Sequence, residues 1–341
     1  MKIKRNLLIT FDYELFLGKN SGTVQNCLIE PTNRLISIFN NKNIKLIFFV
    51  DTIYLLRLKK IKEKYEKAGR DWEQIISQLQ LLLKDGHYLF PHLHPHWLDA
   101  KYLPEINQWD LSDISRYRFH SLAKKEKDFV FDESIKLLHE IIDPIKPEYK
   151  IDSYRAGGWS IQPFEDFKPY FEKYGIKNDF SVIPGKYLYS SALNYDYSAI
   201  YKNEIYQFDE NITITATEDS FIEYPISTIS FSFLEKWLFF KFSGIIKRLG
   251  LSSRFYGETV NMQVEKQGDE LLNGAYDRMT ASFEGLNPVL LLKFILKIPN
   301  TTYFHFISHP KLLDRFILVQ VRILFQILSL FKIQTDFRNI S

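Results

Sequence analysis

The sequence has little cysteine, little net charge and no long uncharged apolar run, and each of these absences excludes a class of protein. Its single cysteine, Cys27, cannot form an internal disulfide, so the chain fits a reducing compartment. A formal net charge of +3 gives no reason to expect a nucleic-acid partner. Every stretch of 18 residues contains a charged side chain, so we expect no membrane-spanning helix.

The N-terminal segment lacks the length of a secretory signal. Basic residues at positions 2–5 are followed by a short apolar run, which ends at Asp12. A signal peptide needs a longer apolar region before its cleavage site. We therefore interpret the run as the first strand of the fold and expect a cytoplasmic protein.

Apolar and aromatic residues are plentiful. A hydrophobic content of 45% can form a sizeable core, and 29 Phe and 20 Tyr bring the aromatic content to 16%. Most of these rings must pack in the core, but some can line a groove that suits sugars.

Short apolar runs alternate with segments of helical periodicity along most of the chain. The runs predict buried strands at Leu7–Phe11, Ile44–Val50, Tyr88–Pro91, Ile151–Tyr154, Asn178–Ile183 and Tyr303–Ser308. This alternation predicts an α/β fold with parallel strands and crossover helices. Residues 185–300 break the rhythm and predict a β-rich and helical insertion before the last strand. No linker divides the chain, so we expect one domain spanning residues 1–341.

The most unusual stretch is Pro91–Trp97, which reads Pro-His-Leu-His-Pro-His-Trp. Several neutral imidazoles close together usually share a metal ion. The sequence thus suggests two ligands, His92 and His96, and a carboxylate ligand from Asp12 or Glu14 at the end of the first strand. The other carboxylate would then stand where a general base is needed.

Four segments resemble, in order, the motifs of the polysaccharide deacetylases, the NodB-homology enzymes of carbohydrate esterase family four. They are Ile9–Asp12, Gly86–His96, Arg155 and Ile307–His309. The resemblance implies a distorted (β/α)7-type barrel. Independently of it, these polar residues lie at or just past strand ends, so we expect the active site at the C-terminal ends of the strands. It also implies a divalent metal, usually zinc, and hydrolysis of an N-acetyl or O-acetyl group on a sugar.

The resemblance further implies a role for each matched residue. Asp12 would be the general base, Arg155 would position it, and His309 would be the general acid. Asp179 would orient His309. The metal ligands would be Glu14, His92 and His96.

The family's arginine is usually followed by proline and an aromatic residue, whereas Arg155 is followed by Ala-Gly-Gly-Trp. Trp159 would then supply the ring that stacks on the sugar. The remaining substrate contacts are expected from His94, Trp97 and Tyr13.

Two other functions fit parts of the pattern. An amidohydrolase-type metal hydrolase also uses a His-x-His pair, but its pair normally follows the first strand rather than the third. A non-catalytic sugar-binding relative would keep the fold alone. It would have no need of the complete set Asp12, Glu14, His92, His96 and His309.

Residues 233–249 combine five aromatic side chains, among them Trp237, Phe239, Phe240 and Phe242, with four basic ones. Such a helix can pack on the barrel, or it can lie on an anionic membrane surface. Because no export signal is evident, the expected substrate is a nucleotide-linked or lipid-linked intermediate of surface-polysaccharide biosynthesis. The expected location is the cytoplasm or the inner face of the membrane.

Overall fold

The computed structural model describes residues 5–39, 44–217, 221–251, 257–259, 262–269 and 277–340, with no side-chain description for 266–269 and 277. Most of the basic segment at positions 2–5 lies outside these ranges. An eight-stranded sheet, in the order β10-β11-β7-β6-β3-β2-β1-β15, organises the described residues. Its strands are β1 (Asn6–Tyr13), β2 (Ile47–Asp51), β3 (Tyr88–Leu93), β6 (Ser153–Ala156), β7 (Asn178–Asp179), β10 (Tyr206–Phe208), β11 (Phe221–Glu223) and β15 (Tyr303–Ser308).

The six predicted strands are all present and pair in parallel from β7 to β15. Almost every residue of β1, β2 and β15 is buried, as expected for parallel strands that are covered on both faces. The chain after β11 crosses towards β15, because Ile226 N donates to Val182 O and Ser227 N donates to His305 O. The curled sheet with this irregular closure confirms the predicted distorted (β/α) barrel.

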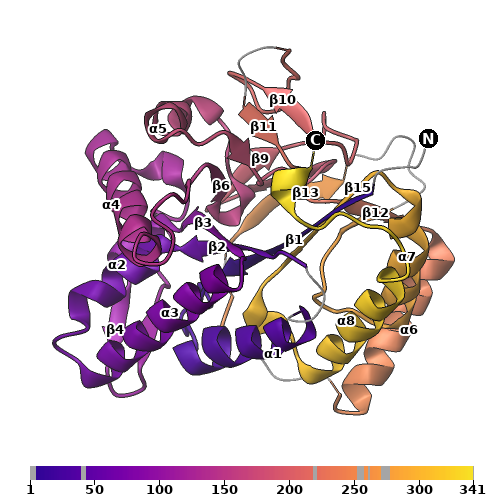
Figure 1. Cartoon of the computed structure of the whole chain (residues 1–341), viewed down its shortest axis with the longest axis horizontal. Coiled ribbons are helices and arrows are strands. Elements are labelled where there is room, and N and C mark those ends of the chain that lie inside the picture. Colours follow the sequence, from indigo (N-terminus) through magenta and orange to yellow (C-terminus); the bar gives the residue numbers. More distant parts are fainter. Residues whose placement is uncertain are drawn as a thin grey trace.

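Helices cover the outside of the sheet (Figure 1). They are α1 (Glu30–Phe39), α2 (Thr52–Ile61), α3 (Glu66–Lys84), α4 (Lys124–Ile142), α5 (Lys168–Tyr174), α6 (Phe233–Arg248), α7 (Pro288–Lys297) and α8 (Arg315–Leu328). Helix α3 buries Ile75, Leu79 and Leu82 at helical spacing, which explains its packing on the barrel. Among the described residues, none of the helices combines the length and apolarity that crossing a bilayer requires.

The predicted insertion before β15 is present. It contains two small antiparallel sheets and the helices α6 and α7. The sheets comprise β8 (Lys186–Ser190), β9 (Asn194–Asp196) and β13 (Val264–Asp269), and β12 (Thr228–Phe231) with β14 (Asp277–Thr280). A further pair, β4 (Lys101–Leu103) and β5 (Gln108–Asp110), lies earlier in the chain. Strands β10 and β11 also fall within 185–300 but join the main sheet, so part of this region builds the barrel itself.

Candidate active site

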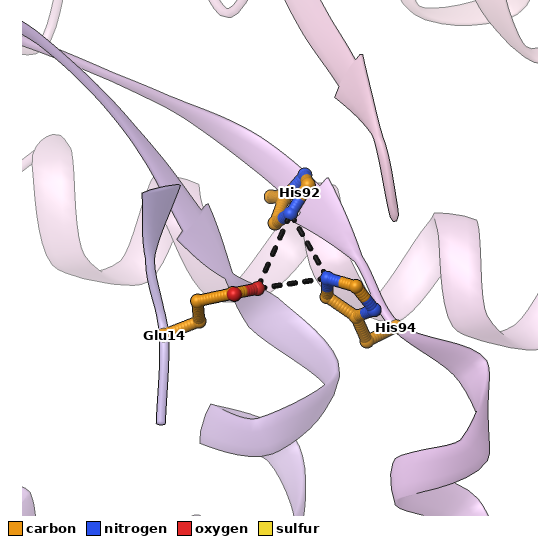
Figure 2. Close-up of side chains that lie close together, drawn as sticks. All are labelled: Glu14, His92 and His94. Atoms are coloured by element: carbon orange, nitrogen blue, oxygen red, sulfur yellow. Dashed lines mark hydrogen bonds and ion pairs between the residues drawn. The ribbon is translucent and has the colours of Figure 1, made fainter. Parts of the chain in front are cut away.

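Glu14, His92 and His94 form a cluster at the C-terminal ends of β1 and β3. Glu14 follows β1, His92 lies on β3 and His94 comes just after it, and the three side chains point toward one another (Figure 2). Oε2 of Glu14 lies 2.8 Å from Nε2 of His94 and 3.4 Å from Nε2 of His92. The two Nε2 atoms are 3.0 Å apart. All three residues are buried, so water competes little for these atoms.

Neighbouring atoms fix the orientation of the His92 ring. Nδ1 of His92 lies 2.9 Å from the carbonyl oxygen of Arg155, which can only accept a hydrogen bond, so Nδ1 carries the proton. In the neutral ring the lone pair is then on Nε2, which faces Glu14 and His94. A backbone carbonyl on the far nitrogen is a common way of orienting a metal-binding histidine.

The chemistry of this donor set fits a divalent metal. The candidate ligand atoms of Glu14, His92 and His94 all lie within 4.8 Å of one another. Ligands at ~2.0–2.1 Å from a tetrahedral zinc ion lie ~3.3 Å apart, close to the separations found here. Two histidines and one carboxylate also form a common hydrolytic zinc set. The cluster could therefore bind a metal ion.

His96, expected as a ligand, lies outside this cluster. Residues in an extended chain point to the same side at alternate positions, which places His94 beside His92. The chain then enters a 3₁₀ helix, Pro95–Asp99, which turns the next residues into the core. The fully buried His96 ring packs against Tyr117 at a centroid distance of 4.6 Å. Burial, followed by the nearby His94, holds the pKa of His96 well below its ordinary value, so the ring is neutral.

Asp12 and Arg155 form a buried ion pair beside the cluster. Nη1 of Arg155 donates to Oδ1 of Asp12 at 2.5 Å, and its Nε donates to the carbonyl oxygen of Phe180 at 3.0 Å. Burial alone would raise the pKa of Asp12, but Arg155, His92 and His309 outweigh burial and hold that pKa below its ordinary value. Asp12 is therefore ionised at neutral pH, as a general base must be.

His309 faces the same two carboxylates from the end of β15. Its Nε2 lies 3.5 Å from Oδ2 of Asp12 and 3.4 Å from Oε1 of Glu14. On its other side, Nδ1 lies 2.7 Å from Oε1 of Glu284, which also accepts from the His309 backbone N–H. Burial alone would lower the pKa of His309, but Glu284, Glu14 and Asp12 outweigh burial and raise it.

Asp179 does not contact His309, although the resemblance implied that it would orient that ring. Its carboxylate accepts from the backbone N–H and the hydroxyl of Ser181, at 3.0 and 2.9 Å. Glu284 takes the expected position instead. It lies in the turn between β14 and α7, a region where the sequence offers no motif to mark it.

A pocket of about 280 Å³ opens over these groups. Asp12, Glu14, His92, His94 and His309 contribute to its lining, together with Trp159, which the sequence predicted as a substrate contact. Trp159 has a positive φ of 58°, rare for a tryptophan and a form of strain that tends to occur at functional sites.

Trp97 and Tyr13, also expected to contact substrate, are buried in the core. Nε1 of Trp97 donates to Asp51, and the hydroxyl of Tyr13 donates to Gln78 at 2.7 Å. Neither side chain is more than 1% exposed, so neither can touch a molecule in the pocket.

Lys311 is a site residue that sequence reasoning missed. Its Nζ lies 2.8 Å from Oε1 of Glu14 and donates to the carbonyl oxygen of Leu15 at 2.6 Å. Lys311 is the largest of the neighbours that outweigh burial and hold the pKa of Glu14 well below its ordinary value. Its position two residues after His309 was the available signal.

The chain resembles solved structures but not curated sequences. Neither a protein-family model nor a curated protein sequence matches the chain. A solved structure from Mycobacterium smegmatis, described as a polysaccharide deacetylase, is similar with a TM-score of 0.51 and 11% identity, covering 98% of this chain and 88% of that chain. The chain therefore has a polysaccharide-deacetylase-type fold, as the sequence motifs predicted.

Two further solved structures are more distant. An allantoinase gives a TM-score of 0.47 at 9% identity, covering 97% of this chain and 86% of that one. A protein from Pseudomonas aeruginosa, described as a polysaccharide deacetylase, gives 0.46 at 10% identity, covering 97% and 87%.

Proposed function

We propose that the protein is a metal-dependent hydrolase that removes acetyl groups from a carbohydrate. The observation that carries this proposal is the convergence of a metal-compatible cluster, an ionised Asp12 and His309 on one pocket. The polysaccharide-deacetylase-type fold supports it, and so does the order of the motifs. We propose Glu14, His92 and His94 as the metal ligands, with zinc as the expected metal.

The chain's own residues would divide the chemistry between them. When bound, the metal would act as a Lewis acid on the acetyl carbonyl and lower the pKa of water. Asp12, held by Arg155, would take a proton from the attacking water. His309, held by Glu284, would then protonate the leaving amine or alcohol of the sugar. The Arg155 guanidinium would hold the Asp12 carboxylate in place and stabilise its charge until it accepts that proton.

The lining of the pocket supports a sugar substrate. Trp159, Leu188 and Leu193 are among its lining residues, and an aromatic ring can stack on a sugar. For the domain organisation, location and substrate class we keep the expectations from the sequence. We propose one domain that acts in the cytoplasm on an acetylated intermediate of surface-polysaccharide biosynthesis.

The metal content and acetate release of purified protein test this function. Wild-type protein should contain metal and release acetate from a panel of N- and O-acetylated sugars. Asp12→Asn should keep its metal but lose ~10²–10⁴-fold in kcat, the usual contribution of a general acid–base group. If that variant lost its metal and Glu14→Gln kept its metal, Asp12 would be the metal ligand and Glu14 the general base. Metal-loaded wild-type protein that releases no acetate would favour the sugar-binding alternative.

A further inference from the structure

Helix α6 presents aromatic side chains to the outside of the molecule. Phe233, Trp237 and Phe240 are 86%, 50% and 61% exposed, and their spacing of four and three residues places them on one face. Phe239 is the single buried residue of the helix. The helix thus packs on the rest of the molecule through Phe239, while these three rings point outward.

The apolar surface continues onto α7, which lies between α6 and α8 (Figure 1). Leu292 and Leu296 on α7 are 56% and 62% exposed. Between the helices runs a groove of about 780 Å³ lined by Leu238 and Phe242 together with these leucines. An exposed apolar surface of this extent usually marks a site of interaction with a protein or a membrane.

The positive charge of this face favours an anionic membrane over a protein partner. Helices α6 and α7 contain six basic residues and one acidic residue, Glu235, which pairs with Lys293. The two helices thus have a net charge of +5, whereas the whole chain has +3, which leaves −2 for the remainder. Lys241 lies over the Trp237 ring, with Nζ 4.7 Å from its centroid, so cation and ring share one surface. Aromatic rings flanked by basic residues favour the interface of an anionic bilayer.

A second groove joins this face to the active-site pocket. It has a volume of about 750 Å³, and Lys236, Phe239 and Phe240 of α6 are among its lining residues. Trp159 and Leu188 line both this groove and the active-site pocket, so the two adjoin. The side chains of Lys186, Lys236 and Arg278 line its course, so the groove is basic as well as partly apolar.

We propose that the α6–α7 face docks on an anionic membrane surface, and that the second groove receives the anionic carrier group of a lipid-linked glycan. Docking would place the groove at the level of the lipid headgroups, with the sugar reaching the pocket past Trp159. The inference about the substrate rests on the proposed deacetylase function, whereas membrane docking does not depend on it.

A second copy of the chain would fit this face less well. In a symmetric dimer each α6–α7 face would meet the same face of its partner, which brings like charges together. An anionic bilayer instead offers the complementary charge and an apolar layer for the rings.

Co-sedimentation with vesicles tests the docking surface. The full chain should bind vesicles of phosphatidylcholine with phosphatidylglycerol at low salt, and release them at high salt. Replacing Lys236, Lys241, Lys247 and Arg248 together by Gln should weaken binding at least ~tenfold, since each basic residue near an anionic surface contributes to it. A matched control replaces four exposed lysines on other helices, Lys60, Lys67, Lys84 and Lys125, by Gln and should bind like wild type.

A separate variant tests the rings. Trp237→Ser with Phe240→Ser should also reduce binding, and the intrinsic fluorescence of wild type should shift to the blue on anionic vesicles if Trp237 enters the interface. Equal loss of binding in the control and in the α6 variant would overturn the proposal, because general charge would then explain it. So would failure to bind anionic vesicles at low salt, or a stable dimer that the ring variant dissociates.

Acetate release separates this inference from the proposed function. Wild-type protein should act faster on an acetylated sugar joined through a diphosphate to a lipid in vesicles than on the same free sugar. A variant with Lys241, Lys247 and Arg248 replaced by Gln, which keeps the groove-lining Lys236, should lose that advantage and keep its rate on the free sugar. Vesicle binding without any acetate release would overturn the deacetylase function and leave docking intact, whereas equal rates on both substrates would overturn the lipid-linked substrate.

Discussion

Nδ1 of His309 lies 2.7 Å from Oε1 of Glu284, although the two residues come from different parts of the fold. The carboxylate can only accept, so it fixes the proton on Nδ1 and turns Nε2 towards Asp12 and Glu14. Glu284 belongs to the region that interrupts the strand–helix alternation. That region therefore contributes to the orientation of the proposed general acid.

We expect Glu284→Gln to lower kcat ~10–10²-fold with metal content unchanged, because Gln keeps the size of the side chain but removes its charge. The measurement is steady-state acetate release alongside metal analysis. Glu284→Asp should recover part of the rate, which a purely structural loss would not allow. Asp179→Asn is the comparison, and a large kcat loss there with a wild-type rate in Glu284→Gln would restore Asp179 to the orienting role.

We expect substitutions of His94 and His96, the two histidines beside Pro95, to have opposite effects on metal binding. His94→Ala should lose bound zinc, because it removes one of the three clustered donors. His96→Phe should retain zinc, because the ring packs against Tyr117 and a phenyl group can occupy similar space. Elemental analysis of protein purified under identical conditions decides between them. If His94→Ala retained zinc and His96→Phe lost it, the ligands would be His92 and His96, as the resemblance implied.

Gly157 is required by the close approach of two chain segments. A Cβ atom at this position would lie 2.2 Å from the carbonyl oxygen of Leu93 and 3.0 Å from Nδ1 of His94. Gly157→Ala should therefore displace His94 and weaken zinc binding ~10-fold or more, the scale on which neighbours of a ligand act. Isothermal titration calorimetry of the metal-free protein measures this loss.

Gly244→Ala on α6 is the matched control, since a Cβ there meets nothing within 4 Å. It should bind zinc like wild type and gain slightly in stability, because alanine favours a helix. Wild-type zinc affinity in Gly157→Ala would show that the segments can move apart without affecting the site.

His87 predicts a pH dependence of stability that is unrelated to catalysis. It is 4% exposed, its Nδ1 accepts from Leu46 N–H at 3.2 Å, and burial lowers its pKa to about 4. The unfolded chain, with a pKa near ~6.5, binds this proton more readily than the folded chain does. Stability should therefore fall as the pH drops from ~6.5 towards 4, by up to about 3 kcal/mol from this one group.

Urea unfolding at several pH values measures this slope in wild type and in His87→Asn. The amide oxygen of Asn can accept the same hydrogen bond but does not titrate, so the variant should lose less stability over that interval. Identical slopes in the two proteins would assign the acid sensitivity to other buried histidines.

The sequence by itself determined the strands of the barrel and the side of the barrel where the site lies. Apolar runs and helical periodicity are local properties, and parallel strands bring their C-terminal ends together whatever the helices between them do. For that reason the positions of Asp12, Arg155 and His309 along the chain are enough to predict that these three residues lie near one another.

The tertiary structure alone decided which groups complete the site. The direction of the chain after Pro95 places His94 rather than His96 beside Glu14, and a turn from the inserted region brings Glu284 rather than Asp179 to His309. The sequence also does not predict which aromatic residues are buried, since Trp97 is buried while Trp237 is exposed. A side chain's residue type does not reveal which neighbours cover it, because burial and contact depend on segments that are distant along the chain.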